Sequence, residues 1–195
     1  MPFVYPVLLE LAGRRAVVIG SLALSERKDA ALRDAGADVE VFANGEWRPE
    51  DLEGAFLCVA SSDDPVERDA IARAARERGV LVNVMDDVAN CDFAAPAVVR
   101  RGDLVIAIGT GGRSPAIASR VRAELERRYG PEWEELVSVV AEVREESRAT
   151  IGDVATRIRG WRRALDLDEA LALVRAGRPD ELRRRLRERL RDEVA

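Results

Sequence analysis

Carboxylates and a glycine-rich turn are the parts of this sequence that could do chemistry. The chain has 195 residues and no histidine, which excludes a histidine base, a Ser-His-Asp triad and a histidine-bound metal. Proton transfer near neutral pH would fall to a carboxylate, a tyrosine, the single lysine, a cysteine or water. Asp86, in Asn83-Val84-Met85-Asp86-Asp87, is a candidate base because it follows a strand-like apolar run. The alternative is that Asp86 and Asp87 are loop acids in water.

The glycine-rich turn is Gly109-Thr110-Gly111-Gly112-Arg113-Ser114-Pro115. Ser114 as N-cap and Pro115 in the first helical position predict that a helix starts here. The free N–H groups at such a start favour a carboxylate or phosphate, and arginine pairs bidentately with carboxylates. The arginines near the turn in sequence are Arg100, Arg101, Arg113, Arg120 and Arg122. A flexible hinge with solvated arginines is the alternative.

A dinucleotide-binding loop is the third candidate. Gly20 ends an apolar run, where glycine lets backbone approach a pyrophosphate. Only this glycine stands in Gly20-Ser21-Leu22-Ala23-Leu24-Ser25, so a plain strand-to-helix turn explains the stretch as well. No acidic residue clearly ends the next strand to hold a ribose, and Asn44 is the best polar candidate. Ser62-Asp63-Asp64 follows a third apolar run, with helix capping as the alternative to a ligand contact.

Short apolar runs predict the strands that would bring these residues together. Strand, helix and strand in fewer than 30 residues predict a right-handed βαβ unit. Ligands of open parallel sheets bind at the carboxyl ends of the strands. The fold class expected for the first part is α/β, with a Rossmann-like, mostly parallel sheet. The predicted strands are Ala16–Gly20, Val39–Ala43, Phe56–Ala60 and Val80–Val84, and the predicted helices are Ser25–Ala35 and Pro65–Arg78.

The second part of the chain predicts a strand pair, Ala97–Val99 and Leu104–Ile108, then a helix over Ser114–Arg128. From Pro131 onward we expect helices only, interrupted near Gly152, Gly160 and Arg178-Pro179.

The basic run Arg183–Arg191 could suggest nucleic-acid binding. However, Leu182, Leu186 and Leu190 recur every four residues. That spacing predicts an amphipathic helix with a solvated basic face.

Bulk composition narrows the partners and the compartment. The formal net charge of −5 gives no overall positive field for nucleic acid. The two cysteines form no CxxC motif, so a disulfide framework or a structural zinc site is not expected. We find neither an apolar run of membrane-spanning length nor the basic start of a signal peptide. We therefore expect a cytoplasmic protein without a resident metal, membrane or nucleic-acid partner.

Taken in order, these motifs resemble the precorrin-2 dehydrogenase/sirohydrochlorin ferrochelatase family, found as the N-terminal domain of sirohaem synthases and as stand-alone relatives. No single motif is specific, but the ordered set is, and it covers roughly residues 1–130. The segments are Pro6-Val7-Leu8-Leu9, Leu11-Ala12-Gly13-Arg14, Glu26-Arg27-Lys28, Ala35-Gly36-Ala37, Asp63-Asp64, Asn83-Val84-Met85-Asp86 with Phe93 and Pro96, and Gly111-Gly112-Arg113-Ser114-Pro115.

The resemblance implies NAD-dependent oxidation of precorrin-2 to sirohydrochlorin, with Fe²⁺ insertion in many members, and a homodimer that exchanges the segment beginning near Ser114. It implies Asp86 as the catalytic residue. The implied cofactor contacts are Gly20, Ser21, Leu22, Ala23, Leu24, Asn44, Gly45, Ser62 and Asp63. The implied tetrapyrrole contacts are Thr110, Gly111, Gly112, Arg113 and Ser114.

The resemblance also implies three parts: a Rossmann-like dinucleotide-binding domain at 1–112, a dimerisation and substrate-pocket segment at 113–150, and a C-terminal helical domain at 151–195. The departures from the family lie on the dinucleotide side. Ser21 and Leu22 replace two glycines, Arg68 replaces an asparagine, and the stretch from Val41 to Phe56 is shorter. A homologue that lost NAD binding and acts as a chelatase or tetrapyrrole-binding protein is therefore an alternative. A dimeric regulator with a nucleic-acid-binding tail is another.

Overall fold

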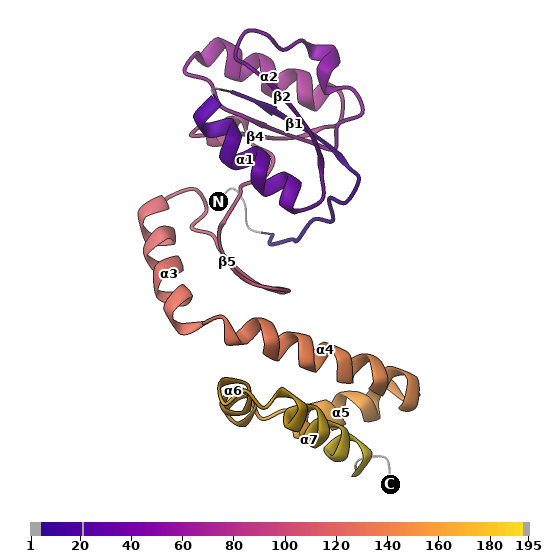
Figure 1. Cartoon of the computed structure of the whole chain (residues 1–195). Coiled ribbons are helices and arrows are strands. Elements are labelled where there is room, and N and C mark those ends of the chain that lie inside the picture. The colour runs from indigo at the N-terminus through magenta and orange to yellow at the C-terminus, as the bar shows by residue number, and fades with distance from the viewer. Residues whose placement is uncertain (1–4, 21, 193–195) are drawn as a thin grey trace. The chain divides into compact units, whose positions relative to one another are not determined.

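The structure is a computed structural model that describes residues 5–20 and 22–192. Side chains are described for residues 5–20 and 28–191. It contains two compact units (Figure 1). The first holds the described residues up to Ala95 together with Thr110–Pro115, and the second holds Pro96–Gly109 and the described residues from Ala116 onward.

The first unit contains β1 (Arg15–Ile19), α1 (Leu22–Asp34), β2 (Asp38–Phe42), the 3₁₀ helix η1 (Pro49–Leu52), β3 (Leu57–Ala60), α2 (Pro65–Glu77), β4 (Leu81–Val84) and the 3₁₀ helix η2 (Val88–Asn90). The second contains β5 (Ala97–Arg101), β6 (Leu104–Ile108), α3 (Pro115–Arg128), α4 (Glu132–Thr150), α5 (Val154–Ala164), α6 (Leu167–Arg175) and α7 (Pro179–Asp192). The first residue of α3, Pro115, is the last residue of the first unit.

A parallel sheet of order β2-β1-β3-β4 is the centre of the first unit. The two central strands, β1 and β3, are short apolar runs with buried residues, as expected where helices cover both faces of a sheet. The chain moves from β1 to β2 on one side and to β3 on the other, so the strand order reverses between β1 and β3. Ligands of open parallel sheets bind at such a reversal. The predicted α/β, Rossmann-like architecture is confirmed.

Helices α1 and α2 cover opposite faces of this sheet (Figure 1). Successive strand residues point to opposite faces, so β1 contributes Val17 and Ile19 to one core and Ala16 and Val18 to the other. Ile71 of α2, fully buried, belongs to the first of these cores. This two-sided burial fixes the strand ends, and with them the loops at the carboxyl edge.

In the second unit, β5 and β6 form an antiparallel hairpin in which Arg101 pairs with Leu104. Gly102 has a φ of 54° in the two-residue turn, a conformation that glycine adopts at little cost. Arg101 donates hydrogen bonds to the carbonyl oxygens of Glu126 (3.1 Å) and Tyr129 (2.8 Å), which ties the hairpin to the end of α3.

Helices α4, α6 and α7 share a core built from Leu136, Val139, Val143, Leu173, Leu182, Leu186 and Leu190, among others. The predicted helical tail is thus confirmed, but one predicted interruption is wrong. Gly160 lies inside α5, where it is buried, and the chain breaks instead at Leu165-Asp166. Asp166 caps α6 by accepting from the N–H groups of Asp168 and Glu169, so the signal at this break was an acidic N-cap.

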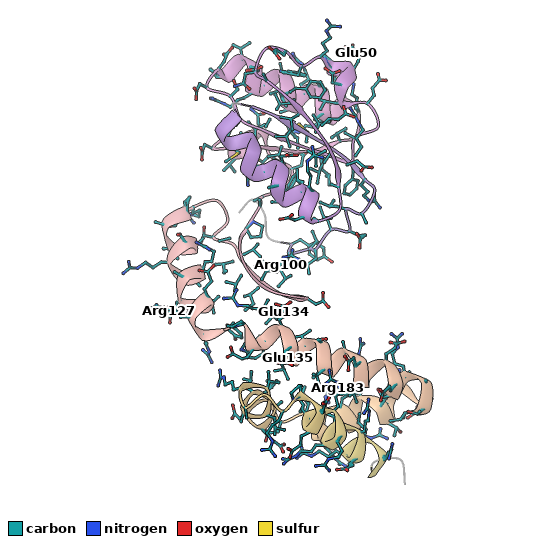
Figure 2. The ribbon with its side chains drawn as sticks, in the orientation of Figure 1. Glu50, Arg100, Arg127, Glu134, Glu135 and Arg183 are labelled. Atoms are coloured by element: carbon teal, nitrogen blue, oxygen red, sulfur yellow. The ribbon has the colours of Figure 1, made fainter. Side chains whose placement is uncertain are left out.

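The leucine stripe of α7 is buried as predicted, with Leu186 1% exposed. The basic face is not merely solvated, however. Arg183, labelled in Figure 2, forms an ion pair with Glu142, and Arg187 forms one with Glu146, both on α4. These arginines therefore serve to join two helices. Among the described helices, none has the length and apolar character needed to cross a membrane.

Candidate active site

Asp86 occupies a strained turn at the carboxyl end of β4. The Asp87 N–H donates to the Val84 carbonyl oxygen at 3.2 Å, which closes the turn. Asp86 has a φ of 60°, and among the described residues it is the only non-glycine residue with a positive φ. That conformation costs a residue with a Cβ about 1–2 kcal/mol. Its side chain is exposed, with no hydrogen bond or ion pair to other described residues.

Asp87, the residue after Asp86, is bound by two neighbouring side chains. The Asp87 carboxylate accepts from Asn90 Nδ2 at 3.1 Å and from Arg68 Nε at 3.2 Å. The hydrogen bond from Asn90 is the main cause of a lowered pKa of Asp87, and Arg68 adds to it. Asp87 is therefore a structural anion, while the carboxylate of Asp86 is left without a partner among the described residues.

The segment after η2 folds back along the edge of β4. The Cys91 Sγ accepts from the Val84 N–H at 3.2 Å, and the Asp92 carboxylate accepts from the Val82 N–H. Asn83 donates to the Phe93 carbonyl oxygen at 2.9 Å. Within the Asn83-Val84-Met85-Asp86 motif, Asn83 therefore binds the returning loop, whereas the Asp86 side chain is exposed.

Glu67, in the first turn of α2, connects three groups at the same edge. Its carboxylate accepts from Ser62 Oγ (2.6 Å), the Gly45 N–H (2.8 Å) and Trp47 Nε1 (2.9 Å). Burial raises the pKa of Glu67, but these three hydrogen bonds outweigh it and the pKa is lowered. Glu67 on α2 thus holds the loop after β2. In the sequence, no acidic residue had been found at the end of that strand.

The residues predicted to contact the cofactor lie along this edge, but not all have free groups. Ser62 is buried and its hydroxyl is engaged by Glu67, and the Gly45 N–H is engaged by the same carboxylate. Asn44 and Asp63 are exposed. Asp64, rather than Asp63, caps α2 by accepting from the Val66 N–H at 2.9 Å.

Gly20 stands at the strand reversal, next to β3. A Cβ at Gly20 would lie 3.2 Å from the Ser61 carbonyl oxygen, so glycine allows β1 and β3 to end in close contact. Helix α1 begins at Leu22, three residues earlier than the predicted start at Ser25. Ser21 and the side chains of Leu22, Ala23 and Leu24 lie outside the described residues, so their predicted cofactor contacts remain predictions.

The glycine-rich turn belongs to the same unit as Asp86. Gly111 and Gly112 have φ values of 62° and 74°, and a Cβ at Gly112 would lie 3.3 Å from the Val88 side chain. The turn therefore packs against η2, two residues beyond Asp86. Thr110 Oγ1 is engaged by the backbone of Ser114, accepting from its N–H at 3.2 Å. α3 begins at Pro115, as predicted.

Two of the five arginines expected around this turn are engaged by other groups. Arg101 is engaged by backbone carbonyls, and Arg122 forms an ion pair with Glu126 at 2.6 Å on α3. These two guanidinium groups are thus committed within the second unit. Arg113 lies in the turn itself, where it is exposed.

Sequence reasoning missed Glu67 and treated Arg68 only as a departure from a family pattern. A signal for Glu67 was present, because Asp64-x-x-Glu67 has the spacing of an N-cap and its third helical residue. That spacing places Glu67 at the carboxyl edge of the sheet. The contact of Arg68, on α2, with Asp87 joins residues 19 positions apart and has no such local signal.

Comparison with known proteins agrees with the family resemblance found in the sequence. A family model for an NAD(P)-binding domain matches residues 7–97, and a model for the central part of sirohaem biosynthesis proteins matches residues 101–128. The siroheme synthase of Pseudomonas paraeruginosa is 33% identical over 95% of this chain, and that of Methylococcus capsulatus is 31% identical over 94%. Nearly the whole length of this chain is therefore similar to one part of these siroheme synthases.

The chain spans 44% and 42% of the length of these two siroheme synthases. A solved structure of SirC, precorrin-2 dehydrogenase, superposes with a TM-score of 0.75 and covers 94% of this chain and 99% of that one. The sequence identity of 21% makes this a likeness of fold.

Proposed function

We propose that the protein oxidises precorrin-2 to sirohydrochlorin with NAD, as the step toward sirohaem. The observation that carries the proposal is Asp86, an exposed carboxylate in a strained turn at the carboxyl edge of a parallel sheet. Strain that the surroundings must maintain is typical of functional positions. The names of the similar proteins, siroheme synthase and precorrin-2 dehydrogenase, supply the substrate class.

The described residues fit a dinucleotide at the strand reversal. Gly20 keeps the end of β1 free of a side chain and close to Ser61, and Asn44 and Asp63 are exposed along the same edge. A bound NAD would supply the hydride acceptor. Glu67 would act indirectly, by fixing the Gly45 loop against Ser62.

The protein's own residues would handle the proton and the substrate's charge. Oxidation removes a hydride and a proton from the tetrapyrrole, and the Asp86 carboxylate would take the proton. The substrate is a polycarboxylate. The Gly111–Gly112 turn, at the start of α3, and the exposed Arg113 would receive one of its carboxylates.

Iron insertion into sirohydrochlorin is a second candidate activity of the same site. It requires removal of two pyrrole protons as Fe²⁺ enters, and the exposed Asp86 carboxylate would accept one, release it to water and then accept the other. The particular observation in its favour is that Ser62 and the Gly45 N–H are committed to Glu67 rather than free for a cofactor. A homologue without NAD turnover would keep this activity alone.

One spectroscopic experiment separates these activities. The protein is mixed with precorrin-2, with and without NAD, and Fe²⁺ is added afterwards while the absorption spectrum is followed. Conversion that requires NAD supports the dehydrogenase. A change only when Fe²⁺ is added to supplied sirohydrochlorin supports a chelatase alone, and no change in either arm rejects both.

We also propose that the protein is a homodimer that uses the second unit. Val98 on β5 is 36% exposed and Val121 on α3 is 37% exposed, which leaves apolar surface that a second copy of the chain would cover. Sedimentation should give twice the monomer mass, and Val121→Lys should shift it toward the monomer. A wild-type monomer at micromolar concentration would contradict the dimer.

A further inference from the structure

Arg68 joins the two loops that border the candidate active site. Its Nη1 donates to the carbonyl oxygens of Ser62 (2.9 Å) and Asp63 (3.3 Å), which follow β3. Its Nε donates to Asp87 at 3.2 Å, on the loop that follows β4. A planar guanidinium presents its donors in a fixed fork that reaches both loops, whereas a lysine ammonium offers its three donors from a single atom.

The partner of Arg68 is the neighbour of Asp86. The Asp87 N–H closes the turn in which Asp86 takes its positive φ. A strained residue keeps its conformation only when surrounding contacts over-determine it. The Asp87 carboxylate is in turn held by hydrogen bonds from Arg68 Nε and Asn90 Nδ2. Loss of the Arg68 contact would let the turn relax.

We propose that Arg68 is a positioning residue that holds the Asp86 turn in register with the β3–α2 loop. The inference rests on the proposed function, because it assumes that Asp86 takes the substrate proton. The Arg68–Asp87 pair is partly shielded, with side-chain exposures of 25% and 22%. The link joins the cofactor side of the edge to the turn that holds the base.

The test compares Arg68→Ala, Arg68→Lys, Asp87→Ala and the double variant Arg68→Ala/Asp87→Ala. Arg73→Ala is the matched control, since Arg73 is exposed on the same helix. For each variant, kcat and KM for NAD are measured with precorrin-2, together with NADH binding by fluorescence and the melting temperature. Misplacement of a catalytic group by about 1 Å can cost 10²-fold in rate.

We expect kcat to fall about tenfold or more in Arg68→Ala and in Asp87→Ala, with KM for NAD and NADH binding within about twofold of wild type. The loss in the double variant should be smaller than the product of the single losses, because both changes break one link. Arg68→Lys should recover part of kcat, and Arg73→Ala should match wild type.

Two results separate failure of this inference from failure of the proposed function. If Asp86→Ala keeps wild-type turnover, the proposed function fails. If Asp86→Ala is inactive but Arg68→Ala and Asp87→Ala keep wild-type kcat, the positioning role is overturned. A change confined to KM for NAD would also overturn it. If Arg68→Ala does not fold, the kcat of Asp87→Ala decides.

Discussion

Asp86 has a backbone conformation that favours glycine, yet it carries a carboxylate. Aspartate adopts the left-handed region more readily than most residues that carry a Cβ. The sequence predicted Asp86 as a candidate base from its place after an apolar run. It could not predict the positive φ, since this depends on contacts of Asp87 with Arg68 and Asn90 from other segments.

This strain gives a stability prediction. Asp86→Gly should give a protein more stable than Asp86→Ala by about 1 kcal/mol, because only glycine relieves the left-handed strain. Both variants should be inactive. Urea unfolding measures the difference, and a protein in which Asp86→Ala is the more stable of the two would contradict the strain.

A second residue-scale prediction concerns Glu67. Glu67→Ala removes the acceptor of three hydrogen bonds and leaves the Gly45 loop unfastened. Unpaired donors cost about 1–3 kcal/mol each when buried, so we expect lower stability and several-fold weaker NADH binding. Glu77→Ala, at the exposed end of the same helix, is the control. Equal NADH binding in the two variants would argue against the role of Glu67.

At the scale of elements, α7 joins the helical unit through both its faces. The leucine spacing predicted the buried face from the sequence alone. The pairing of its arginines with glutamates on α4 was not predictable in the same way, because 41 residues separate each pair. The interruption expected at Gly160 failed for a related reason, since burial and packing in α5 override a single glycine's helix propensity.

Truncation of the buried face tests this packing. Leu186→Ala should lower the free energy of unfolding by roughly 2–5 kcal/mol, because the side chain is 1% exposed. Leu167→Ala, at an exposed leucine on α6 (49% exposed), should change it by less than about 0.5 kcal/mol. Chemical denaturation compares the two, and equal losses would be inconsistent with the described core.

The ion pairs of the helical unit predict a pH dependence. A hydrogen bond from Arg187 lowers the pKa of Glu146. Hydrogen bonds from Arg189 and Arg185 lower the pKa of Glu169. A lowered folded-state pKa gives stability that is present above the unfolded glutamate pKa of about 4.3 and is lost as the pH falls below it.

The melting temperature should therefore fall as the pH drops from about 5 to about 3. High salt should flatten the decline, because the pairs are largely exposed. A melting temperature that stays constant over this range would contradict a stabilising role for the pairs.

At the scale of the whole molecule, the chain forms two compact units, and the two family models match successive parts of it. The parallel sheet and the helical tail could be predicted because short apolar runs and a four-residue leucine spacing are local signals. The connection of Gly112 to Val88, and of Glu67 to Gly45, could not, because each joins loops that lie apart in sequence. The candidate site therefore follows from tertiary contacts that fix predicted residues in place.

The most direct measurement is the rate of precorrin-2 oxidation in a single turnover with saturating NAD, in wild type and in Asp86→Asn. The substitution keeps the size of the side chain and removes the basic carboxylate, so we predict a rate loss of about 10²-fold or more with NADH binding unchanged. A wild-type rate in Asp86→Asn would contradict the assignment of the base on which the account depends.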